Sequence, residues 1–193
     1  MTRVHPRIAE LLDHLDRHHI ALRAAVDAVP SALRGQRPAP DRWSVSEVLE
    51  HLGLVERRFT QFFAARVAEA RARGLGADPE TTPVVPAFDV AAAVDRRRTI
   101  TALESVVPRG DLDAERAWTA LDDAHRGLRA AMVAADGCAL GELTFSHPAF
   151  GALDFYQWLV FLGAHESRHA DQIREIGRAL SAPPPVETVQ PNA

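Results

Sequence analysis

Four long stretches of this 193-residue chain repeat apolar residues at intervals of three and four positions. That spacing places the apolar side chains on one face of an α-helix, which must then be buried against other elements. The pattern predicts helices over about 4–29, 45–73, 113–136 and 154–180. A chain of this length can bury one core but is short for two domains. We therefore expect an all-α fold, a four-helix bundle that forms one domain over 1–180.

The ends of the predicted helices carry capping residues. Ser44 with Glu47, and Asp154 with Gln157, have the spacing of a capping box, in which each side chain bonds to backbone at a helix start. The segment 78–112 contains several prolines and has poor apolar spacing. We expect it to be a long crossover with at most short helical pieces.

The composition excludes several classes of protein. A net charge of −4 argues against a nucleic-acid-binding surface, and the lack of lysine excludes Schiff-base chemistry through that residue. A single cysteine, Cys138, favours a reducing compartment. No run approaches the roughly 20 apolar residues of a membrane span, and the N-terminus does not read as a secretory signal. We expect a cytoplasmic protein with a flexible, proline-rich tail over 181–193.

Two histidines interrupt the apolar face of the last helix. His165 and His169 in "FLGAHESRHADQI" are four positions apart and therefore project the same way. An imidazole that is buried without a partner costs about 1–3 kcal/mol, so this pair requires partners. His51, beside the apolar face of the second helix, is the candidate third ligand. Three imidazoles with open coordination positions are typical of a catalytic metal site, and zinc, nickel and iron(II) all suit them.

The spacing alone does not establish a metal site. His14 and His18 have the same separation in the first helix, where charged neighbours suggest that His14 is solvated. His18 lies nearer the apolar face and is expected to line a pocket. On spacing and burial, the pair at 165 and 169 fits metal ligands and also core histidines bonded to carboxylates, without a metal.

Other polar residues suggest supporting roles. Glu47 either caps its helix or orients the histidine one turn later. Glu166 is expected on a solvated face, and Asp122 and His125, three apart, could pair in a polar pocket. His147 is expected to shape the turn before the last helix more than to act as a base.

Two longer segments carry a family resemblance. "DRWSVSEVLEHLGLVERR" and "SHPAFGALDFYQWLVFLGAHESRHADQIREI" resemble the DinB-like (DinB/YfiT) superfamily of bacterial four-helix bundles, and the order of the helices matches over most of the chain. The resemblance implies one divalent metal ion bound by His51, His165 and His169. It also implies an up-down-down-up topology, in which parallel second and third helices need the long crossover.

The resemblance further implies a class of chemistry. Characterised members include S-transferases that use bacillithiol, mycothiol or glutathione, and a mycothiol-dependent maleylpyruvate isomerase. We expect a metal-dependent enzyme, such as a low-molecular-weight thiol S-transferase or a small-substrate hydrolase. The alternative is a non-catalytic metal-binding or stress-response bundle. Expected partners are a small-molecule substrate or a thiol, and a homodimer through an exposed helical face, with neither nucleic acid nor membrane.

Overall fold

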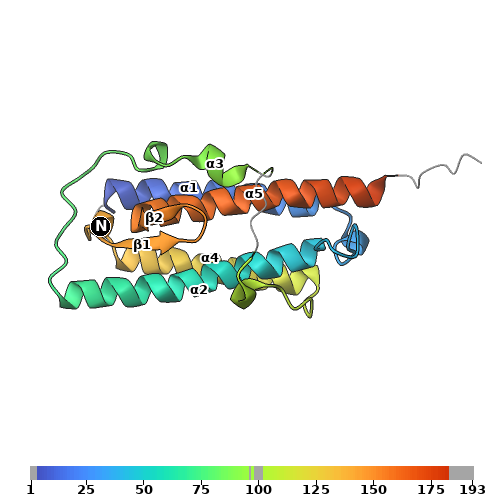
Figure 1. Ribbon diagram of the computed structural model, residues 1–193, viewed down its shortest axis with the longest axis horizontal. Helices are drawn as coiled ribbons and strands as arrows, with labels where there is room; N and C mark the ends of the chain where they lie inside the picture. The colour runs from blue at the N-terminus through green and yellow to red at the C-terminus, as the bar shows by residue number, and fades with distance from the viewer. Residues whose placement is uncertain (1–3, 96, 98–101, 183–193) are drawn as a thin grey trace, which may run out of the picture.

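The computed structural model describes residues 4–95, 97 and 102–182, and these are mostly helical. Its long helices lie along the long axis of the molecule (Figure 1). The four predicted helices are confirmed and closely match their predicted ends: α1 Pro6–Asp27, α2 Val45–Ala72, α4 Ala114–Ala134 and α5 Phe155–Ser181.

The long helices pack mainly as two pairs, α1 against α5 and α2 against α4. In the first pair, Gly163 lies beside His14 and Gly177 lies beside Val29, so α1 and α5 run in the same direction. The close approach at both glycines leaves little room between these helices.

The second pair is also parallel. Gly53 lies against the backbone of Leu121, and Arg71 donates to the carbonyl of Ala134. The chain must therefore return along the molecule between α2 and α4 (Figure 1). It does so through the expected crossover, whose short helical pieces are η2 Val85–Ala87, α3 Val90–Val94 and η3 Glu104–Val106. Of these, α3 packs on α5.

The expected all-α fold class is broadly confirmed, and the chain departs from it at one place. Strands β1 Thr144–His147 and β2 Gly151–Asp154 form an antiparallel hairpin immediately before α5. Each strand has only four residues, which is too short for an alternating pattern to be distinguished from a loop. Gly151 adopts a positive φ of 73°, which a residue with a side chain rarely adopts. Two further 3-10 turns are η1 Ser31–Leu33 and η4 Leu140–Glu142.

The apolar core consists of two clusters. One cluster packs around Leu15, Phe63 and Leu159, and the other packs around Leu22, Leu49 and Ile173. On every long helix, buried polar residues separate the positions that belong to one cluster from those that belong to the other. The core therefore contains an internal polar layer, which holds His19, Glu56, His125 and Glu166.

No helix in the described ranges is long and apolar enough to cross a membrane. The predicted tail lies outside the described residues from position 183 onward. The predicted domain boundary at 180 falls in the last turn of α5.

Candidate metal centre

The structure brings together the three histidines that the sequence singled out. His165 and His169 lie one turn apart on α5, and His51 reaches them from α2. The His51 ring centroid lies 5.4 Å from that of His165 and 5.1 Å from that of His169. One ring nitrogen from each residue falls in a group whose members are all within 4.8 Å of one another. These three residues are called the histidine triad below.

Hydrogen bonds at the far side of two rings define their tautomers. His51 Nδ1 lies 2.7 Å from the carbonyl oxygen of Val106, which can only accept, so Nδ1 carries the proton. His169 Nδ1 lies 2.8 Å from Gln172 Oε1 and donates to it in the same way. In both neutral rings the Nε2 lone pair is left available, and His169 Nε2 lies 3.1 Å from His165 Nε2.

Burial keeps His51 and His165 in the form that a metal ligand requires. It lowers the pKa of His51, and it lowers the pKa of His165 well below the usual value, with a further contribution from the neighbouring His169 and His51. Protonation would cost the solvation of a charge inside the protein. Both imidazoles are therefore neutral near pH 7.

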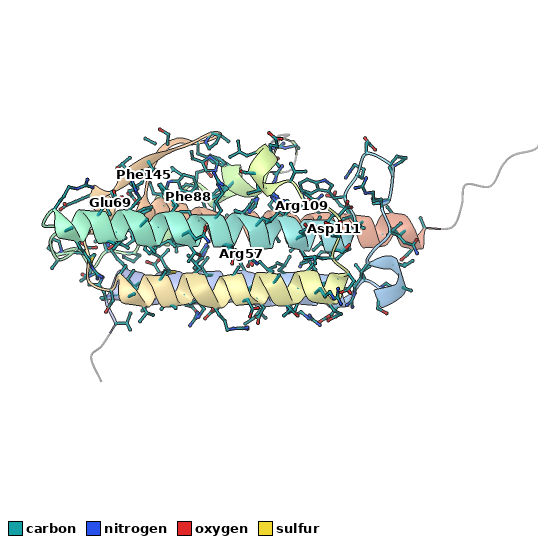
Figure 2. All side chains as sticks on the ribbon, turned by 90° about the horizontal axis from the view of Figure 1, so that it is seen from below. Arg57, Glu69, Phe88, Arg109, Asp111 and Phe145 are labelled. Atoms are coloured by element: carbon teal, nitrogen blue, oxygen red, sulfur yellow. The ribbon has the colours of Figure 1, made fainter. Side chains whose placement is uncertain are left out.

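A cavity of about 820 Å³ opens beside the histidine triad, and all three rings line it. Much of its wall is aromatic, from Trp43, Phe59, Phe62, Phe145, Trp158 and Phe161. Figure 2 shows Phe145 on the side of α2 that faces away from α4. The hairpin, α2 and α5 together form a largely apolar chamber next to the imidazoles.

The charged side chains that line the cavity are all cationic among the residues that the structure describes. They are Arg58 and Arg66 on α2 and Arg168 on α5. Arg168 also donates to the carbonyl oxygen of Asp95, beside α3. The cavity therefore combines an apolar body with positive charge at its wall.

The group that orients His51 is the carbonyl of Val106 in η3, and the sequence did not predict it. Glu47 instead forms the capping box with Ser44 and an ion pair with Arg37. The capping interpretation of Glu47 is confirmed, and the orienting one is wrong. A backbone carbonyl carries no residue-specific signal, so only the fold could reveal it.

Two residues expected in solvent are buried. Glu166 is 1% exposed, because α5 is covered on more than one side. His14 is 3% exposed, and its Nε2–H donates to the carbonyl of Val160 at 3.0 Å. Both expectations assumed a single buried stripe per helix, and both are wrong.

The remaining predicted residues take different partners from those expected. His125 Nε2 lies 3.2 Å from Asp16 Oδ1 on α1, whereas Asp122 pairs with Arg126. The proposed pair of Asp122 and His125 is therefore wrong. His147 lines the cavity, and its Nδ1 accepts from the backbone N–H of Ala149 at 3.0 Å. The turn-shaping role of His147 is confirmed.

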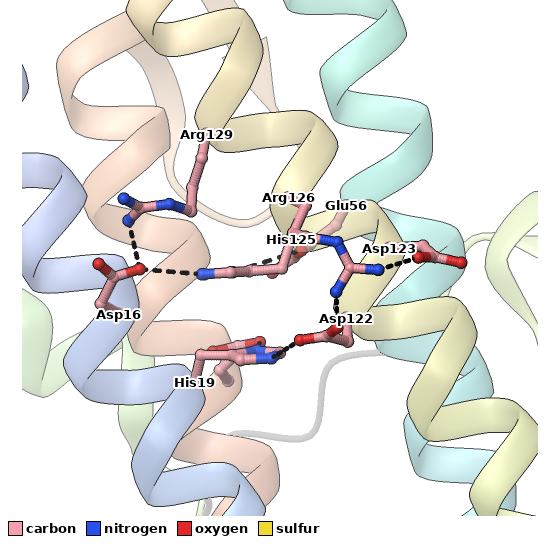
Figure 3. Close-up of polar contacts among 9 residues, drawn as sticks. Asp16, His19, Glu56, Asp122, Asp123, His125, Arg126 and Arg129 are labelled. Atoms are coloured by element: carbon pink, nitrogen blue, oxygen red, sulfur yellow. Dashed lines mark hydrogen bonds and ion pairs between the residues drawn. The ribbon is translucent and has the colours of Figure 1, made fainter.

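A second polar cluster, which sequence reasoning did not assemble, lies in the internal polar layer (Figure 3). His19, His125 and Glu166 each offer a ligand atom within 4.8 Å of the others. Burial, with the nearby Glu56 carboxylate, raises the pKa of Glu166 well above its usual value. Burial also lowers the pKa of His19 to about 4. The sequence analysis did not single out His19, although this residue continues the three-and-four spacing between Leu15 and Leu22.

Comparisons with known proteins match most of this chain. The family model of the DinB superfamily matches residues 8–173. An uncharacterized protein of Bacillus subtilis (strain 168), YuaE, is 29% identical over 146 residues, which span 73% of this chain and 81% of the relative. No solved structure matches the chain.

Proposed function

Because this chain belongs to the DinB superfamily, we propose that it is a metal-dependent enzyme with an up-down-down-up four-helix bundle that acts on a small organic anion. The histidine triad, His51, His165 and His169, would hold one divalent ion. The observation that carries the proposal is the cavity of about 820 Å³ that the three imidazoles line. An ion that only stabilised the core would need no such chamber.

The donor set fits a divalent transition metal. Two nitrogens bound to one ion at 2.0–2.1 Å lie roughly 3 Å apart, and the Nε2 atoms of His165 and His169 are 3.1 Å apart. The tautomers of His51 and His169 leave lone pairs on the nitrogens opposite the bonded Nδ1 atoms. Zinc, nickel and iron(II) all accept imidazole ligands.

The bound ion would supply Lewis acidity, which favours a thiolate or hydroxide over the protonated form at neutral pH. The chain's own groups have three tasks. Val106 and Gln172 hold the imidazole rings in place, the aromatic wall excludes water, and the cavity arginines attract an anionic group of the substrate. The reaction classes that suit this arrangement are transfer of a low-molecular-weight thiol to an electrophile and hydrolysis of a small substrate.

The second candidate is a metal-binding or stress-response bundle without catalysis. The residues of the histidine triad serve that role equally well. The cavity and its arginines favour the enzyme, because they offer room and positive charge for a small organic anion.

Metal analysis tests the histidine triad. Protein purified without a histidine tag and loaded with zinc should lose one equivalent of metal on His165→Ala. His18→Gln is the matched control, because His18 has the same spacing from His14 but lies outside the cavity, and its metal content should equal that of the wild type. Unchanged metal content in His165→Ala would refute the proposed centre.

Turnover separates the enzyme from the binder. Zinc-loaded protein is incubated with an electrophile and each of several low-molecular-weight thiols, and separately with small esters and amides. We expect turnover that His165→Ala abolishes and that Arg168→Gln weakens mainly through KM. A cobalt-substituted protein whose absorption spectrum is unchanged by thiol, together with no turnover, would favour the non-catalytic bundle.

A further inference from the structure

The internal polar layer contains one side chain from each long helix: His19 of α1, Glu56 of α2, His125 of α4 and Glu166 of α5. His19 and His125 stack with ring centroids 4.0 Å apart. His19 Nδ1 lies 2.9 Å from Glu166 Oε1, and His125 Nδ1 lies 3.9 Å from Glu56 Oε2. The layer therefore gathers two imidazoles and two carboxylates at one level of the bundle.

Several polar atoms in this layer have no hydrogen-bond partner within the part of the chain that the structure describes. They are both carboxylate oxygens of Glu56, Oε2 of Glu166, Nδ1 of His125 and Nε2 of His19, the last of which has Asp122 Oδ1 3.4 Å away. Glu56 and Glu166 are each 1% exposed. An unsatisfied buried polar group costs about 1–3 kcal/mol, and more if it is charged. Five such atoms in one layer require an explanation.

The neighbouring cations do not supply one. Arg126 bonds to Asp122 and Asp123 at the edge of the layer, and Arg129 bonds to Asp16 (Figure 3). These ion pairs lie on the outer side, where the carboxylates are 35% to 60% exposed. The chain contains no lysine. The two inner carboxylates therefore face each other and the two histidines.

We propose that Glu56, Glu166, His125 and His19 form a second binding site, for one divalent transition-metal ion, inside the bundle. Two carboxylates balance the charge of the ion, and two imidazoles complete a mixed nitrogen and oxygen donor set. His19 is already neutral, because burial lowers its pKa to about 4. His125, whose pKa the Glu56 and Asp16 carboxylates raise against the effect of burial, would release its proton when the ion binds. Paired carboxylates and histidines from facing helices are a recurrent way to hold metal inside a bundle. The ion would satisfy the unpartnered oxygens and Nδ1 of His125, and it would offset the repulsion between Glu56 and Glu166.

This site is independent of the histidine triad, because the two share no residue. Both sites draw on α2, through His51 and Glu56, and on α5, where Glu166 follows His165 in sequence and faces the layer. The side of α5 that carries His165 and His169 faces the cavity instead. Each site can therefore be emptied by substitution without removing a ligand of the other.

The test counts metal in folded protein with zinc as the probe. Untagged protein is saturated with zinc, freed of loosely held ion and analysed for metal per chain. We expect two equivalents in the wild type and one in the variant His51→Ala/His165→Ala/His169→Ala. Glu56→Gln, which preserves side-chain volume, should lose one equivalent and bind zinc at least tenfold more weakly at the layer. Glu69→Gln, an exposed glutamate on the same helix, is the matched control and should retain two.

The outcomes separate the two sites. One equivalent that is lost in His165→Ala but retained in Glu56→Gln overturns the second site and leaves the triad intact. One equivalent that is lost in Glu56→Gln but retained in His165→Ala supports the layer and overturns the triad. If Glu56→Gln does not fold, cobalt titration of the triple variant decides. A new visible absorption band that saturates at one equivalent supports the layer, and its absence overturns it.

Discussion

Gly163 allows α1 and α5 to approach closely at one residue. A Cβ built at this position would lie 2.4 Å from His14 Nε2 and 2.6 Å from His14 Cδ2, far inside normal contact. His14 cannot move without losing its bond to the Val160 carbonyl. The buried position of His14 therefore requires a glycine at position 163.

We predict that Gly163→Ala destabilises the protein by about 1–3 kcal/mol, because the added methyl overpacks the helix interface. Gly127, a helical glycine on α4, provides the control, because a Cβ at that position would meet no atom within 4 Å. Gly127→Ala should stabilise by about 0.5–1 kcal/mol through helix propensity. Urea unfolding of both variants measures the difference. Equal stability of Gly163→Ala and the wild type would contradict this close packing of α1 and α5.

The ionisation of His18 predicts a pH dependence. Burial, aided by His14 and Arg17, lowers the pKa of His18 to about 4. The unfolded chain takes up the proton first, at about pH 6.5. Stability that is present above pH 6.5 is therefore lost as the pH falls toward 4, by at most about 1.4 kcal/mol per pH unit for one proton.

His18→Gln should reduce the slope of stability against pH in metal-free protein between pH 6.5 and 5. Urea midpoints at several pH values measure it, and chelator in every sample removes the contribution of bound metal. An unchanged slope in His18→Gln would show that His18 titrates normally in the folded protein.

At the scale of elements, Asp78 links the start of the crossover to α1 and α5 through hydrogen bonds. Its carboxylate accepts from the Tyr156 hydroxyl of α5 and from Arg7 Nη1 of α1, the latter at 3.2 Å. The Asp78 side chain is 4% exposed. Burial alone would raise the pKa of Asp78, but the bonds from Tyr156, the Glu80 N–H and Arg7 outweigh it and lower the pKa.

Asp78→Asn should lower the free energy of unfolding by about 1–3 kcal/mol at pH 7. The reason is that a neutral amide replaces the carboxylate that accepts hydrogen bonds from the Tyr156 hydroxyl and the Arg7 guanidinium. A carboxyl with a lowered pKa contributes stability above about pH 3.9, its unfolded value, and loses that stability as the pH falls through the folded pKa. The difference in stability between the variant and the wild type should therefore shrink as the pH falls below about 3.9. Thermal unfolding at pH 7 and at low pH measures this, and a difference that stays constant would contradict it.

The helices were predictable from sequence and the hairpin was not. Long periodic segments such as α2 and α5 carry many repeats of the pattern, and their caps at Ser44 and Asp154 mark their starts. The strands around Phe145 and Leu153 each offer only four residues. These strands form because they pack against α5. Such tertiary packing leaves no local pattern in the sequence.

The histidine triad was predictable because imidazoles on an apolar stripe stand out. The polar layer was not predicted, although signals were present. Glu56 continues the spacing of Leu52, Phe59 and Phe63, and all of these side chains are buried. A glutamate at such a position is ordinarily taken as the edge of a stripe. Its burial becomes evident only when all four helices are placed together.

At the scale of the whole molecule, the internal polar layer divides the core into two apolar clusters. The histidine triad lies beside this layer on α2 and α5, where the crossover and the hairpin add walls to the cavity. Apolar packing thus stabilises the two halves of the helical core, and buried polar side chains lie between them. The long crossover also reaches the histidine triad, because its Val106 carbonyl orients His51.

The proposed function depends above all on His51, His165 and His169 binding one metal ion beside an open cavity. X-ray diffraction from zinc-loaded crystals, recorded on both sides of the zinc absorption edge, locates such an ion without reference to activity. We expect an anomalous peak bonded to Nε2 of all three histidines, with the cavity side of the ion free of further protein ligands. Zinc-saturated crystals with no anomalous peak between these three nitrogens would contradict the proposed centre.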